Sequence, residues 1–539
     1  MNSNGENHEF YLKDEVYFEP LFNKWYAWPY LIPPVTAARY TEKTHLRIMK
    51  SFVNNYQLHI LAAQESELSG GEFLNCTKEQ VEEIRALIDR TETHYGDCVK
   101  LSKAISQLDK LLVSHTDGTS LEPLYKDVPE MLRGYVELTY DRHHRAGFRL
   151  IEPLLYNSDF YHPELQSLSF GLISKVDERP FVLSTPRLAD DNHLQVAANF
   201  NHSFVDKIFK ARTQPVSQAE IDEMFEGLEL TGGLNYQELF TTDKPVHKSL
   251  GVKDGVQLRY LGHAGFLVQT EHVSVLIDPI IATRSTKNCD QVVSFTELPD
   301  HIDYVCLTHT HQDHVNFETL LQLRHKIGKI VVPKNNGGEL QDPSLKLMLS
   351  QLGFSVIELD ECEDVHVTEG VITSIPFFGE HGDLNIRSKS AWLLNIEGRK
   401  MFFGADSANP DISLYKNLKP YMENLDVYAI GMECVGAPYT WLYGALCTEK
   451  VPNSIKDTRR LNGSDADQAS EVVELIKPEH IFVYALGMEP WYKYFMGIEY
   501  DENSEQVKQI ERFSVAAGLW NIEVESLFGK RDLFFPKVG

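Results

Sequence analysis

Residues 308–314 read Thr308-His309-Thr310-His311-Gln312-Asp313-His314. A strand-like apolar run, Tyr304–Thr308, leads directly into this segment, and a helical pattern, Phe317–Lys326, follows it. Histidines two residues apart on such a turn can converge on one ion, while the next acidic residue and histidine reach a neighbouring ion. Imidazole and carboxylate ligands suit divalent first-row metals. The segment therefore predicts a loop that holds two metal ions through His309, His311, Asp313 and His314.

The pattern around this loop predicts a sandwich of two sheets. Before the loop, two β-rich runs separated by a polar turn indicate an antiparallel pair: Gln257–Val268 and Val273–Ile277. After it come the strands Lys329–Val332, Val371–Pro376, Ala391–Ile396 and Lys400–Phe403. Strands and helices then alternate: helix 411–423, strand Val427–Ile430, helix 465–477, strand Ile481–Ala485 and helix 504–517. Hairpin-joined strands followed by strand–helix alternation suit two sheets packed face to face with helices outside.

The first part of the chain indicates a separate domain of mixed α/β type. Residues 44–62 place apolar side chains at helical spacing, and Phe181–Thr185 is expected to be a short strand. Two capping-box pairs open further helices: Thr77 with Gln80, and Ser217 with Glu220. The segment Gly232–Gly255 is rich in turns, so we place the domain boundary there, near residue 245. The predicted domains are residues 1–245 and 246–539.

The charge balance argues against an enzyme that acts on nucleic acids. The 539 residues include 51 basic and 78 acidic ones, which gives a formal net charge of −27. A protein that binds nucleic acid needs a basic surface to neutralise phosphates, and this chain has no such excess on average. The densest basic segment is Arg142–Arg149, which we expect to form one solvated face of a helix.

Cysteine usage and hydropathy predict a cytoplasmic protein. Seven cysteines are scattered along the chain without a C-x-x-C pair, which argues for a reducing compartment rather than a disulfide framework. No apolar run reaches the length of about 18 residues that a membrane-spanning helix needs. The first ten residues, MNSNGENHEF, lack the basic and apolar regions of a secretory signal.

The segment at 308–314 resembles the H-x-H-x-D-H signature of the metallo-β-lactamase superfamily. Two earlier segments look like the opening strands of that superfamily: Leu261-Gly262-His263-Ala264-Gly265 and Leu276-Ile277-Asp278-Pro279. The resemblance implies an α/β fold, namely a C-terminal αββα sandwich with metals at its rim, here preceded by the mixed α/β N-terminal domain. It also implies that Asp278 is a structural carboxylate near the cluster. We expect His263 to be a turn residue rather than a ligand.

Two further positions can be matched to the superfamily. The strand Phe402–Ala405 leads into Asp406, where the superfamily places the aspartate that bridges both metals. Phe377-Phe378-Gly379-Glu380-His381-Gly382 has Gly-Glu where hydrolases of the superfamily usually have Gly-His. Glu380 therefore occupies the ligand position and His381 is displaced by one residue, so we favour Glu380 as the ligand.

The last histidine ligand of the superfamily follows a late strand. Here that strand, Ile481–Ala485, has no histidine at its C-terminal end, and Glu433 and Glu489 both remain open as replacements. A glutamate at position 380 and the loss of another histidine make the ligand set rich in carboxylates. Such a harder set favours iron over zinc. Carboxylate-rich diiron sites bind and reduce O₂, because anionic ligands support the higher oxidation states.

A closer resemblance covers nearly the whole chain, including the early aromatic segment Trp25-Tyr26-Ala27-Trp28-Pro29. The chain looks like the diiron β-hydroxylases of chloramphenicol biosynthesis and other nonribosomal peptide pathways. These enzymes hydroxylate the β-carbon of an amino acid held as a thioester on the phosphopantetheine arm of a carrier protein. The resemblance implies a diiron monooxygenase with two iron ions, O₂ as co-substrate, an external electron donor and the aminoacyl-loaded peptidyl carrier protein of a nonribosomal peptide synthetase as partner. It also implies a homodimer, with the N-terminal domain mediating dimerisation and shaping access to the cluster.

The same resemblance divides the ligands between the two ions. His309, His311 and Glu380 hold one iron, Asp313 and His314 hold the other, and Asp406 bridges them. Glu380 is the expected catalytic residue, because movement of its carboxylate opens a site for O₂ when the loaded carrier docks. Two aromatic loops are candidates for the substrate tunnel: Tyr439-Thr440-Trp441 and Pro490-Trp491-Tyr492. Because carrier domains are usually acidic, Arg142–Arg149 is the candidate docking face.

Two other functions remain open from the sequence. A dizinc hydrolase of the same fold, acting on a phosphodiester, a lactone or a thioester, would activate a metal-bound water as the nucleophile. A diiron domain of this type could also act without catalysis, as a sensor of O₂ or nitric oxide. The metal content and the consumption of O₂ separate these functions from the hydroxylase.

Overall fold

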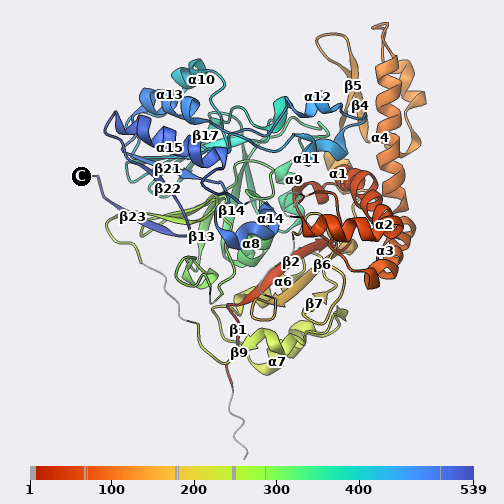
Figure 1. Cartoon of the computed structure of the whole chain (residues 1–539), viewed down its shortest axis with the longest axis horizontal. Coiled ribbons are helices and arrows are strands. Elements are labelled where there is room, and N and C mark those ends of the chain that lie inside the picture. Colours follow the sequence, from red (N-terminus) through yellow and green to blue (C-terminus); the bar gives the residue numbers. More distant parts are fainter. Residues whose placement is uncertain are drawn as a thin grey trace, which may run out of the picture.

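The computed structural model describes residues 8–65, 68, 71–176, 179, 181–245, 251–285, 287–497 and 499–538. The chain folds into a C-terminal sandwich of two sheets and an N-terminal part that packs against it (Figure 1). The predicted domain boundary adjoins residues 246–250, and the segment expected to lack a secretory signal includes residues 1–7; both stretches lie outside the described residues. Within the described ranges, no helix combines the length and the apolar character that crossing a bilayer requires.

Each sheet of the sandwich has seven strands. The first sheet has the order β15 (Val356–Leu359), β14 (Ile327–Pro333), β13 (Ile302–Cys306), β12 (Ser274–Ile277), β11 (Gly265–Gln269), β10 (Gly255–Gly262) and β23 (Arg531–Pro536). The second has the order β16 (Asp364–Val367), β17 (Gly370–Pro376), β18 (Ser390–Ile396), β19 (Arg399–Phe403), β20 (Val427–Gly431), β21 (His480–Tyr484) and β22 (Val524–Ser526). Strands β12 to β15 pair in parallel, and so do β19 to β22. The carboxyl ends of these parallel strands therefore meet at one edge of each sheet.

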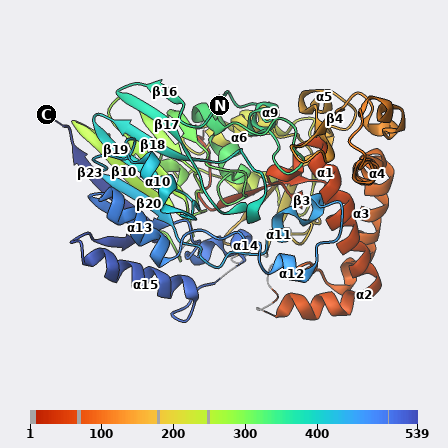
Figure 2. The same ribbon diagram turned by 90° about the horizontal axis from the view of Figure 1, so that it is seen from above.

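Apolar side chains from the facing sides of the two sheets, such as Val275, Trp392 and Phe403, form the core between them. Helices cover the outer faces (Figure 2). On the first sheet lie α8 (Phe317–Leu323) and α9 (Leu345–Gln351), and on the second lie α10 (Ile412–Leu418), α13 (Ala466–Ile476) and α15 (Glu505–Gly518). Short helices fill the connections: α11 (Thr440–Tyr443), the 3₁₀ turn η12 (Gly444–Leu446), α12 (Asn453–Lys456) and α14 (Lys493–Met496). This order of layers confirms the predicted αββα sandwich.

The N-terminal part is mixed α/β, as predicted. Its five-stranded sheet has the order β3 (Trp25–Tyr26), β2 (Val16–Phe22), β6 (Gln166–Leu172), β7 (His193–Val196) and β8 (Leu230–Thr231). Two smaller sheets pair β1 (Tyr11–Leu12) with β9 (Phe240–Thr241), and β4 (Val136–Tyr140) with β5 (Ala146–Leu150). The helices are α1 (Pro34–Tyr40), α2 (Leu46–Gln64), α3 (Val81–His94), α4 (Gly96–Ser114), α5 (Glu152–Tyr156), α6 (Ser203–Lys210) and α7 (Gln218–Phe225). Both predicted capping boxes are present. Helices α2 to α4 lie on the side away from the sandwich (Figure 1).

Buried charged residues join the N-terminal sheet to the sandwich. Glu19 on β2 forms ion pairs with Arg179 at 2.8 Å and with Arg187 at 2.7 Å. Arg179 also pairs with Glu318 on α8 at 2.9 Å, and the Tyr26 hydroxyl donates to Glu318 at 3.0 Å. Each buried carboxylate in this interface network therefore has a cation beside it, and the network connects β2 to α8.

Two strand predictions are wrong. The run Gln257–Val268 is two strands rather than one, because β10 ends at Gly262 and the backbone turns at His263 with a φ of 48° before β11 begins. Phe181–Thr185 is a bent segment rather than a strand. There the Val182 amide donates to the carbonyl of Tyr494, which lies on α14 of the sandwich, at 2.8 Å. The hydrogen-bond partner comes from a distant helix and not from a neighbouring strand.

The prediction that Arg142–Arg149 forms one face of a helix is also wrong. These residues form the turn and second strand of the β4–β5 hairpin, not a helix face. The Asp141 carboxylate accepts hydrogen bonds from the amides of His143 and Arg145, at 2.7 and 2.9 Å, and this stabilises the turn. Arg145 and Arg149 each form an ion pair within the hairpin, with Asp141 and Glu137.

Candidate metal centre

Loops at one edge of the sandwich bring the predicted ligands together. Residues 309–314 follow β13, Glu380 and His381 follow β17, and Asp406 follows β19. Asp278 follows β12, and His263 lies in the turn between β10 and β11. Ligands far apart in the sequence can therefore converge, because each lies just beyond the end of a neighbouring strand.

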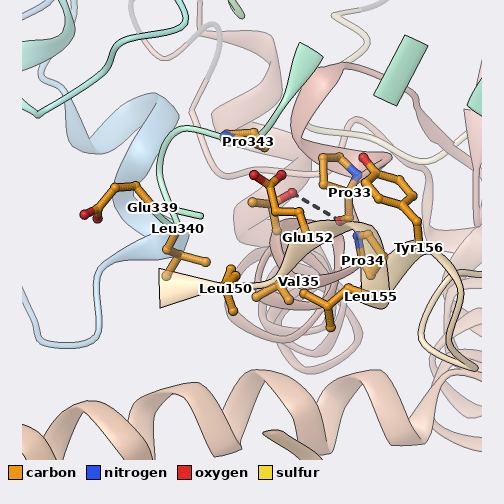
Figure 3. Close-up of a pocket in the computed structure, with 11 residues that line it drawn as sticks. Pro33, Pro34, Val35, Leu150, Glu152, Leu155, Tyr156, Glu339, Leu340 and Pro343 are labelled. Atoms are coloured by element: carbon orange, nitrogen blue, oxygen red, sulfur yellow. Dashed lines mark hydrogen bonds between the residues drawn. The ribbon is translucent and has the colours of Figure 1, made fainter. Parts of the chain in front are cut away.

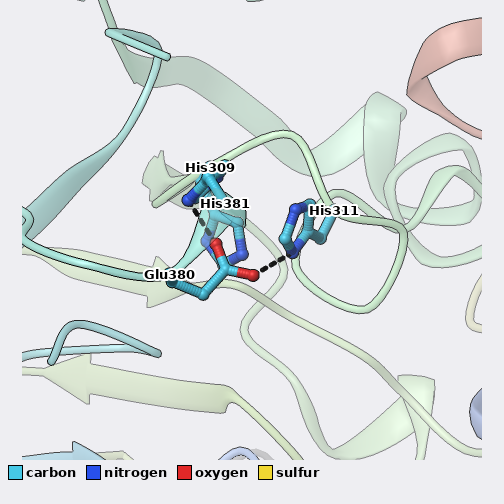
Figure 4. A group of neighbouring side chains, drawn as sticks. All are labelled: His309, His311, Glu380 and His381. Carbon is cyan, nitrogen blue, oxygen red and sulfur yellow. Dashed lines mark ion pairs between the residues drawn. The ribbon is translucent and has the colours of Figure 1, made fainter. Parts of the chain in front are cut away.

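The first group of possible ligands consists of His309, His311, Glu380 and His381, all buried (Figure 4). One ligand atom of each residue lies within 4.8 Å of the others. The Glu380 carboxylate is 3.4 Å from Nδ1 of His311 and also contacts the His381 ring. The structure thus brings together the three residues predicted for one iron and adds His381, which the sequence had made the less favoured alternative to Glu380.

Two further groups adjoin the first. His309, His314 and Asp406 form one of them, with Oδ2 of Asp406 at 3.2 Å from Nε2 of His314 and 3.8 Å from Nε2 of His309. The other consists of His263, Asp313 and His314, with Nε2 of His263 at 3.2 Å from Oδ2 of Asp313. His309 and His314 are each shared between two groups, which is the arrangement expected of a cluster with two neighbouring ions.

Asp278 orients His314. Its Oδ2 atom is 2.7 Å from Nδ1 of His314, and the Thr308 amide and hydroxyl donate to the same carboxylate. A carboxylate on one ring nitrogen sets the tautomer and leaves the other nitrogen free to bind a metal. Nε2 of His314 accordingly points to Asp406. The expectation that Asp278 is a structural carboxylate near the cluster agrees with these contacts.

Tyr443 has the corresponding position beside His311. Its hydroxyl is 3.0 Å from Nε2 of His311, while Nδ1 of the same ring faces Glu380. If Nδ1 binds a metal, Nε2 carries the proton and donates it to the Tyr443 oxygen. Tyr443 lies on α11, so this short helix contributes to the orientation of a ligand on the loop after β13.

Several buried atoms at this site lack hydrogen-bond partners. They are Nε2 of His309, Nδ1 of His263, both ring nitrogens of His381, one carboxylate oxygen of Glu380 and one of Asp406. Buried polar atoms in proteins are almost always hydrogen-bonded, because leaving them unpaired costs about 1–3 kcal/mol each. A concentration of such nitrogen and oxygen atoms around one site is explained by a cation that binds there. The mixed imidazole and carboxylate donors suit iron.

The pKa values at the site reflect the same lack of positive charge. Burial, with a further contribution from the Asp406 carboxylate, raises the pKa of Glu380 to about 7, although His311 opposes the shift. Burial lowers the pKa of His311 to about 4. A cation bound between the two side chains would favour the carboxylate and the neutral imidazole, which are the forms that bind metals.

The backbone around the site is strained. Positive φ angles occur at His263, Asp278, Glu380, His381 and Ala405, all of which are non-glycine residues. Glu380 has φ 50° and ψ −168°, close to a region that is otherwise adopted almost only by glycine. Such strain costs roughly 1–3 kcal/mol per residue and tends to cluster at functional sites. The strand ends therefore hold the ligands in place at an energetic cost to the fold.

Neither candidate for the vacant ligand position belongs to these groups. Glu489 accepts hydrogen bonds from the Tyr260 hydroxyl at 3.0 Å and from the amides of His263 and Gly529 at 3.3 and 3.1 Å. Glu433 accepts from Tyr500 and from Gln506. His263 lies in a turn, as expected, but it also belongs to one of the groups of possible ligands, with Asp313 and His314. Its position immediately after the glycine that ends a strand was the available signal.

A small cavity lies at the interface between the N-terminal part and the sandwich (Figure 3). Its volume is about 20 Å³, little more than one water molecule occupies, and Pro33, Pro34 and Leu155 contribute to its lining. Glu152 accepts hydrogen bonds from the Asn335 side chain at 2.8 Å and from the Ser344 amide at 2.9 Å. Burial raises the pKa of Glu152 to about 7. This carboxylate joins the two parts of the chain, and the cavity is too small for a substrate.

Comparisons with known proteins agree with this geometry. Residues 11–245 match the diiron non-heme β-hydroxylase N-terminal domain, and residues 274–437 match the β-lactamase superfamily domain. The 4-amino-L-phenylalanyl-[CmlP-peptidyl-carrier-protein] 3-hydroxylase of Streptomyces venezuelae is 33% identical over 503 residues, which cover 91% of this chain and 93% of that enzyme. The crystal structure of CmlA, a diiron β-hydroxylase from Streptomyces venezuelae, aligns at a TM-score of 0.90 and 31% identity, over 98% of this chain and 100% of that chain. A glutamate-to-aspartate variant of CmlA aligns over the same shares at a TM-score of 0.88 and 30% identity.

Proposed function

This chain belongs to the diiron non-heme β-hydroxylases, and from that premise we propose that it hydroxylates the β-carbon of an amino acid tethered to a peptidyl carrier protein. The relative from Streptomyces venezuelae is named for 3-hydroxylation of a 4-amino-L-phenylalanyl group on the CmlP carrier protein. The observation that carries the proposal is the carboxylate of Glu380 beside His309 and His311 in one buried group. A glutamate in that position makes the ligand set harder and suits iron.

We assign the ligands as follows, with the groups of converging atoms as support. His309, His311 and Glu380 are the proposed ligands of one iron, Asp313 and His314 those of the other, and Asp406 the residue between them. Two irons held there would supply the activation of O₂, with electrons from an external donor. Glu380 is the proposed catalytic residue, because its buried carboxylate lies between His311 and His381 and a carboxylate can change how it binds a metal.

The surrounding residues keep the ligands oriented and dry. Asp278 directs Nε2 of His314 towards Asp406, and Tyr443 directs Nδ1 of His311 towards Glu380. The ligand side chains are at most 14% exposed, so bulk water has little access to them. Exclusion of water protects reactive species and strengthens electrostatic interactions in an oxidising site.

We also propose a homodimer formed through the N-terminal part. Leu58 and Leu61 on α2 and Val113 on α4 are large apolar side chains with 60–63% exposure on the surface away from the sandwich. Light scattering of the wild type and of a Leu58→Glu/Leu61→Glu variant tests this proposal: a dimer that becomes a monomer is the expected result. The division into residues 1–245 and 246–539 and the cytoplasmic location stay predictions, the latter supported by seven unpaired cysteines among the described residues.

The decisive experiment uses the full chain purified from iron-supplemented cells. Iron and zinc are quantified, the protein is reduced, and carriers loaded with different amino acids are offered under ¹⁸O₂, beginning with 4-amino-L-phenylalanine. We expect two irons per chain and one ¹⁸O atom at the β-carbon of the tethered amino acid. Iron-loaded protein that consumes no O₂ and modifies no loaded carrier would overturn the proposal.

The same measurements separate the other functions. Two zincs per chain with hydrolysis of an ester, and no uptake of O₂, would favour the hydrolase. Two irons that bind O₂ or nitric oxide without turnover on any carrier would favour the sensor. The membership of the chain in a hydroxylase family and its carboxylate-rich ligand groups both favour the oxidative reaction.

A further inference from the structure

A cavity of about 790 Å³ lies between the two parts of the chain. One wall comes from α1, the turn η2 (Thr41–His45) and the start of α2, and the opposite wall comes from residues 438–456 of the sandwich. This volume lies within the usual range of ligand sites, roughly 300–1,000 Å³. Trp441, from one of the two aromatic loops, lines the cavity and remains 40% exposed. In the other loop, Tyr492 is completely buried against Phe495.

The wall formed by α11 and η12 separates this cavity from the metal centre. Leu442 and Gly444 face the cavity, and Tyr443 between them places its hydroxyl 3.0 Å from Nε2 of His311. A second connection runs through Trp28, which lines the cavity and whose ring centroid lies 5.1 Å from that of Tyr30, with the two rings tilted by 48°. The Tyr30 hydroxyl lies 3.2 Å from the side chain of Thr310, in the ligand loop. The cavity therefore ends one side chain away from the ligands.

The wall is fixed by contacts to the N-terminal part. Arg39 on α1 is completely buried and donates to the carbonyls of Ala445 and Cys447, at 3.1 and 2.7 Å. Thr448 donates to Asp109 on α4. Because buried hydrogen bonds to a charged group are worth about 1.5–3 kcal/mol, these contacts keep the cavity preformed.

The charge of the cavity is opposite to that of the whole chain. Basic residues at its lining outnumber acidic ones: Lys43, Arg47, Lys450 and Lys456 against Glu72 and Glu449. The chain as a whole has 51 basic and 78 acidic residues. Two of the four cations already have partners, because Arg47 pairs with Glu72 and Lys43 lies 3.2 Å from Glu42. Lys450 and Lys456 form no ion pair with any described residue.

We propose that this cavity takes the phosphopantetheine arm of the carrier protein, with Lys450 and Lys456 binding its phosphodiester at the mouth. This inference rests on the proposed function, which requires a tethered substrate. An arm of this kind has an anionic phosphate at one end and a thin, largely uncharged chain beyond it. The cavity offers both kinds of lining, since it has two lysines without ion pairs to described residues, Lys450 and Lys456, and an aromatic side chain, Trp28, beside the tyrosine that contacts the ligand loop.

The alternative docking face on the β4–β5 hairpin has a weaker claim. Arg145 is paired with Asp141 at 2.7 Å and Arg149 with Glu137 at 2.5 Å, so both guanidinium groups already have an anionic partner. Exchanging an existing ion pair for a new one gains little free energy. The unpaired lysines of the cavity offer a larger gain to an incoming phosphate, and electrostatic attraction there also guides the arm towards its path.

The test compares Lys450→Glu/Lys456→Glu with a control, Lys416→Glu, which reverses an exposed lysine on α10. All proteins are iron-loaded full chains with the thermal stability and iron content of the wild type. Binding of fluorescent carrier, with and without its arm, is measured by anisotropy, and free phosphopantetheine and pantetheine are used as competitors. We expect the double variant to bind the armed carrier about 10-fold more weakly and to lose the preference for phosphopantetheine over pantetheine. The control binds as the wild type does.

Two results would overturn the inference: equal binding of the armed carrier by the wild type and the double variant, or equal competition by phosphopantetheine and pantetheine with the wild type. Kinetics separate it from the proposed function. A raised KM for the loaded carrier with an unchanged kcat supports the arm site. If the double variant hydroxylates the loaded carrier with an unchanged KM, the arm site is wrong and the proposed function stands. If the wild type binds the carrier in an arm-dependent way but hydroxylates no carrier, the arm site stands and the proposed function is wrong.

Discussion

Two clusters of buried charge lie on either side of the start of α8 and differ in how far their charges are satisfied. In the interface network, Glu19 and Glu318 are both bound to arginines, and nearly every polar atom has a partner. In the metal centre, His309, Glu380 and Asp406 are equally buried but retain nitrogen and oxygen atoms without hydrogen bonds. The two clusters are similarly buried, but only the interface network has a partner for each charge.

Whether a buried carboxylate is paired with a cation distinguishes a structural role from a functional one. A buried carboxylate that is already paired with a cation contributes to how the two parts of the chain fit together. A buried carboxylate without a cation destabilises the fold unless something else supplies the positive charge. Strain adds to this contrast, because positive φ angles accumulate at His263, Asp278, Glu380, His381 and Ala405. The metal centre therefore carries two costs that the interface network does not.

The largest effect is expected for Glu380→Gly. Removing the carboxylate takes away a proposed ligand, so hydroxylation of the loaded carrier falls by at least about 100-fold, as loss of a ligand exceeds the 10–100-fold cost of an outer-shell change. The same substitution relieves the backbone at φ 50°, so the iron-free protein becomes more stable by about 1 kcal/mol. Product analysis and urea unfolding of iron-free protein measure both effects.

Glu397→Gly is the matched control, because Glu397 also has a positive φ, 49°, but lies in the turn between β18 and β19, remote from the ligand groups. This variant is expected to keep its activity. Retained activity in Glu380→Gly, or an equal loss in both variants, would contradict the assignment of Glu380.

The next effect concerns the interface network. Arg179→Met leaves Glu318 buried without its cation, so the free energy of unfolding is expected to fall by about 3–5 kcal/mol, while each folded molecule still binds two irons. The control is Arg512→Met, which removes an ion pair with Asp467 in which both side chains are more than half exposed and costs less than about 1 kcal/mol. Urea unfolding and iron analysis provide the measurements. Loss of iron from folded Arg179→Met would show that the two clusters are not separate in role.

Local patterns allowed most of this architecture to be predicted. The strand, ligand loop and helix at 304–326 are contiguous, so spacing alone indicated both their structure and their chemistry. The capping boxes at Thr77 and Ser217 depend only on residues three positions apart. The αββα sandwich followed from the alternation of strands and helices together with the resemblance to a known superfamily.

Features that depend on distant residues could not be predicted. Strand β23 pairs with β10 across most of the C-terminal part, and its sequence, Arg531–Pro536, has no strong strand pattern of its own. His263 approaches Asp313 only because β11 and β12 place the two turns at the same edge. Glu489 was open as a ligand until its three hydrogen bonds to other groups were known. The missing information in each case is which chain segment becomes a neighbour.

The dependence of stability on pH gives a third test, because the pKa of a buried carboxylate is lowered by a neighbouring cation and raised where no cation is present. Burial favours the neutral form of Glu19, but Arg187 and Arg179 reverse this effect and lower its pKa to about 2. Glu19 therefore stabilises the fold above its ordinary pKa of 4.5, and this contribution is lost as the pH falls towards 2. Burial raises the pKa of Glu152 to about 7, so its contribution is present below pH 4.5 and is lost as the pH rises to 7.

Urea unfolding of the wild type, Glu19→Gln and Glu152→Gln across this range measures both contributions. The stability of the wild type relative to Glu152→Gln is expected to fall by about 3 kcal/mol between pH 4.5 and 7. Relative to Glu19→Gln it is expected to rise with pH below 4.5 and then to stay constant. Parallel pH profiles for the two pairs would contradict the distinction between paired and unpaired carboxylates.

The smallest effect is expected for Tyr443→Phe, which leaves the ring beside His311 but removes the hydroxyl 3.0 Å from Nε2. Loss of a partner to a ligand histidine typically weakens metal binding or activity by 10–100-fold, and a single neutral hydroxyl places this variant near 10-fold. Competition with a chelator measures the affinity for iron. Tyr156→Phe is the control, because the Tyr156 hydroxyl is buried without a hydrogen-bond partner and its removal leaves the metal centre unchanged. Equal affinity for iron in Tyr443→Phe and the wild type would mean that His311 keeps its orientation without the Tyr443 hydroxyl.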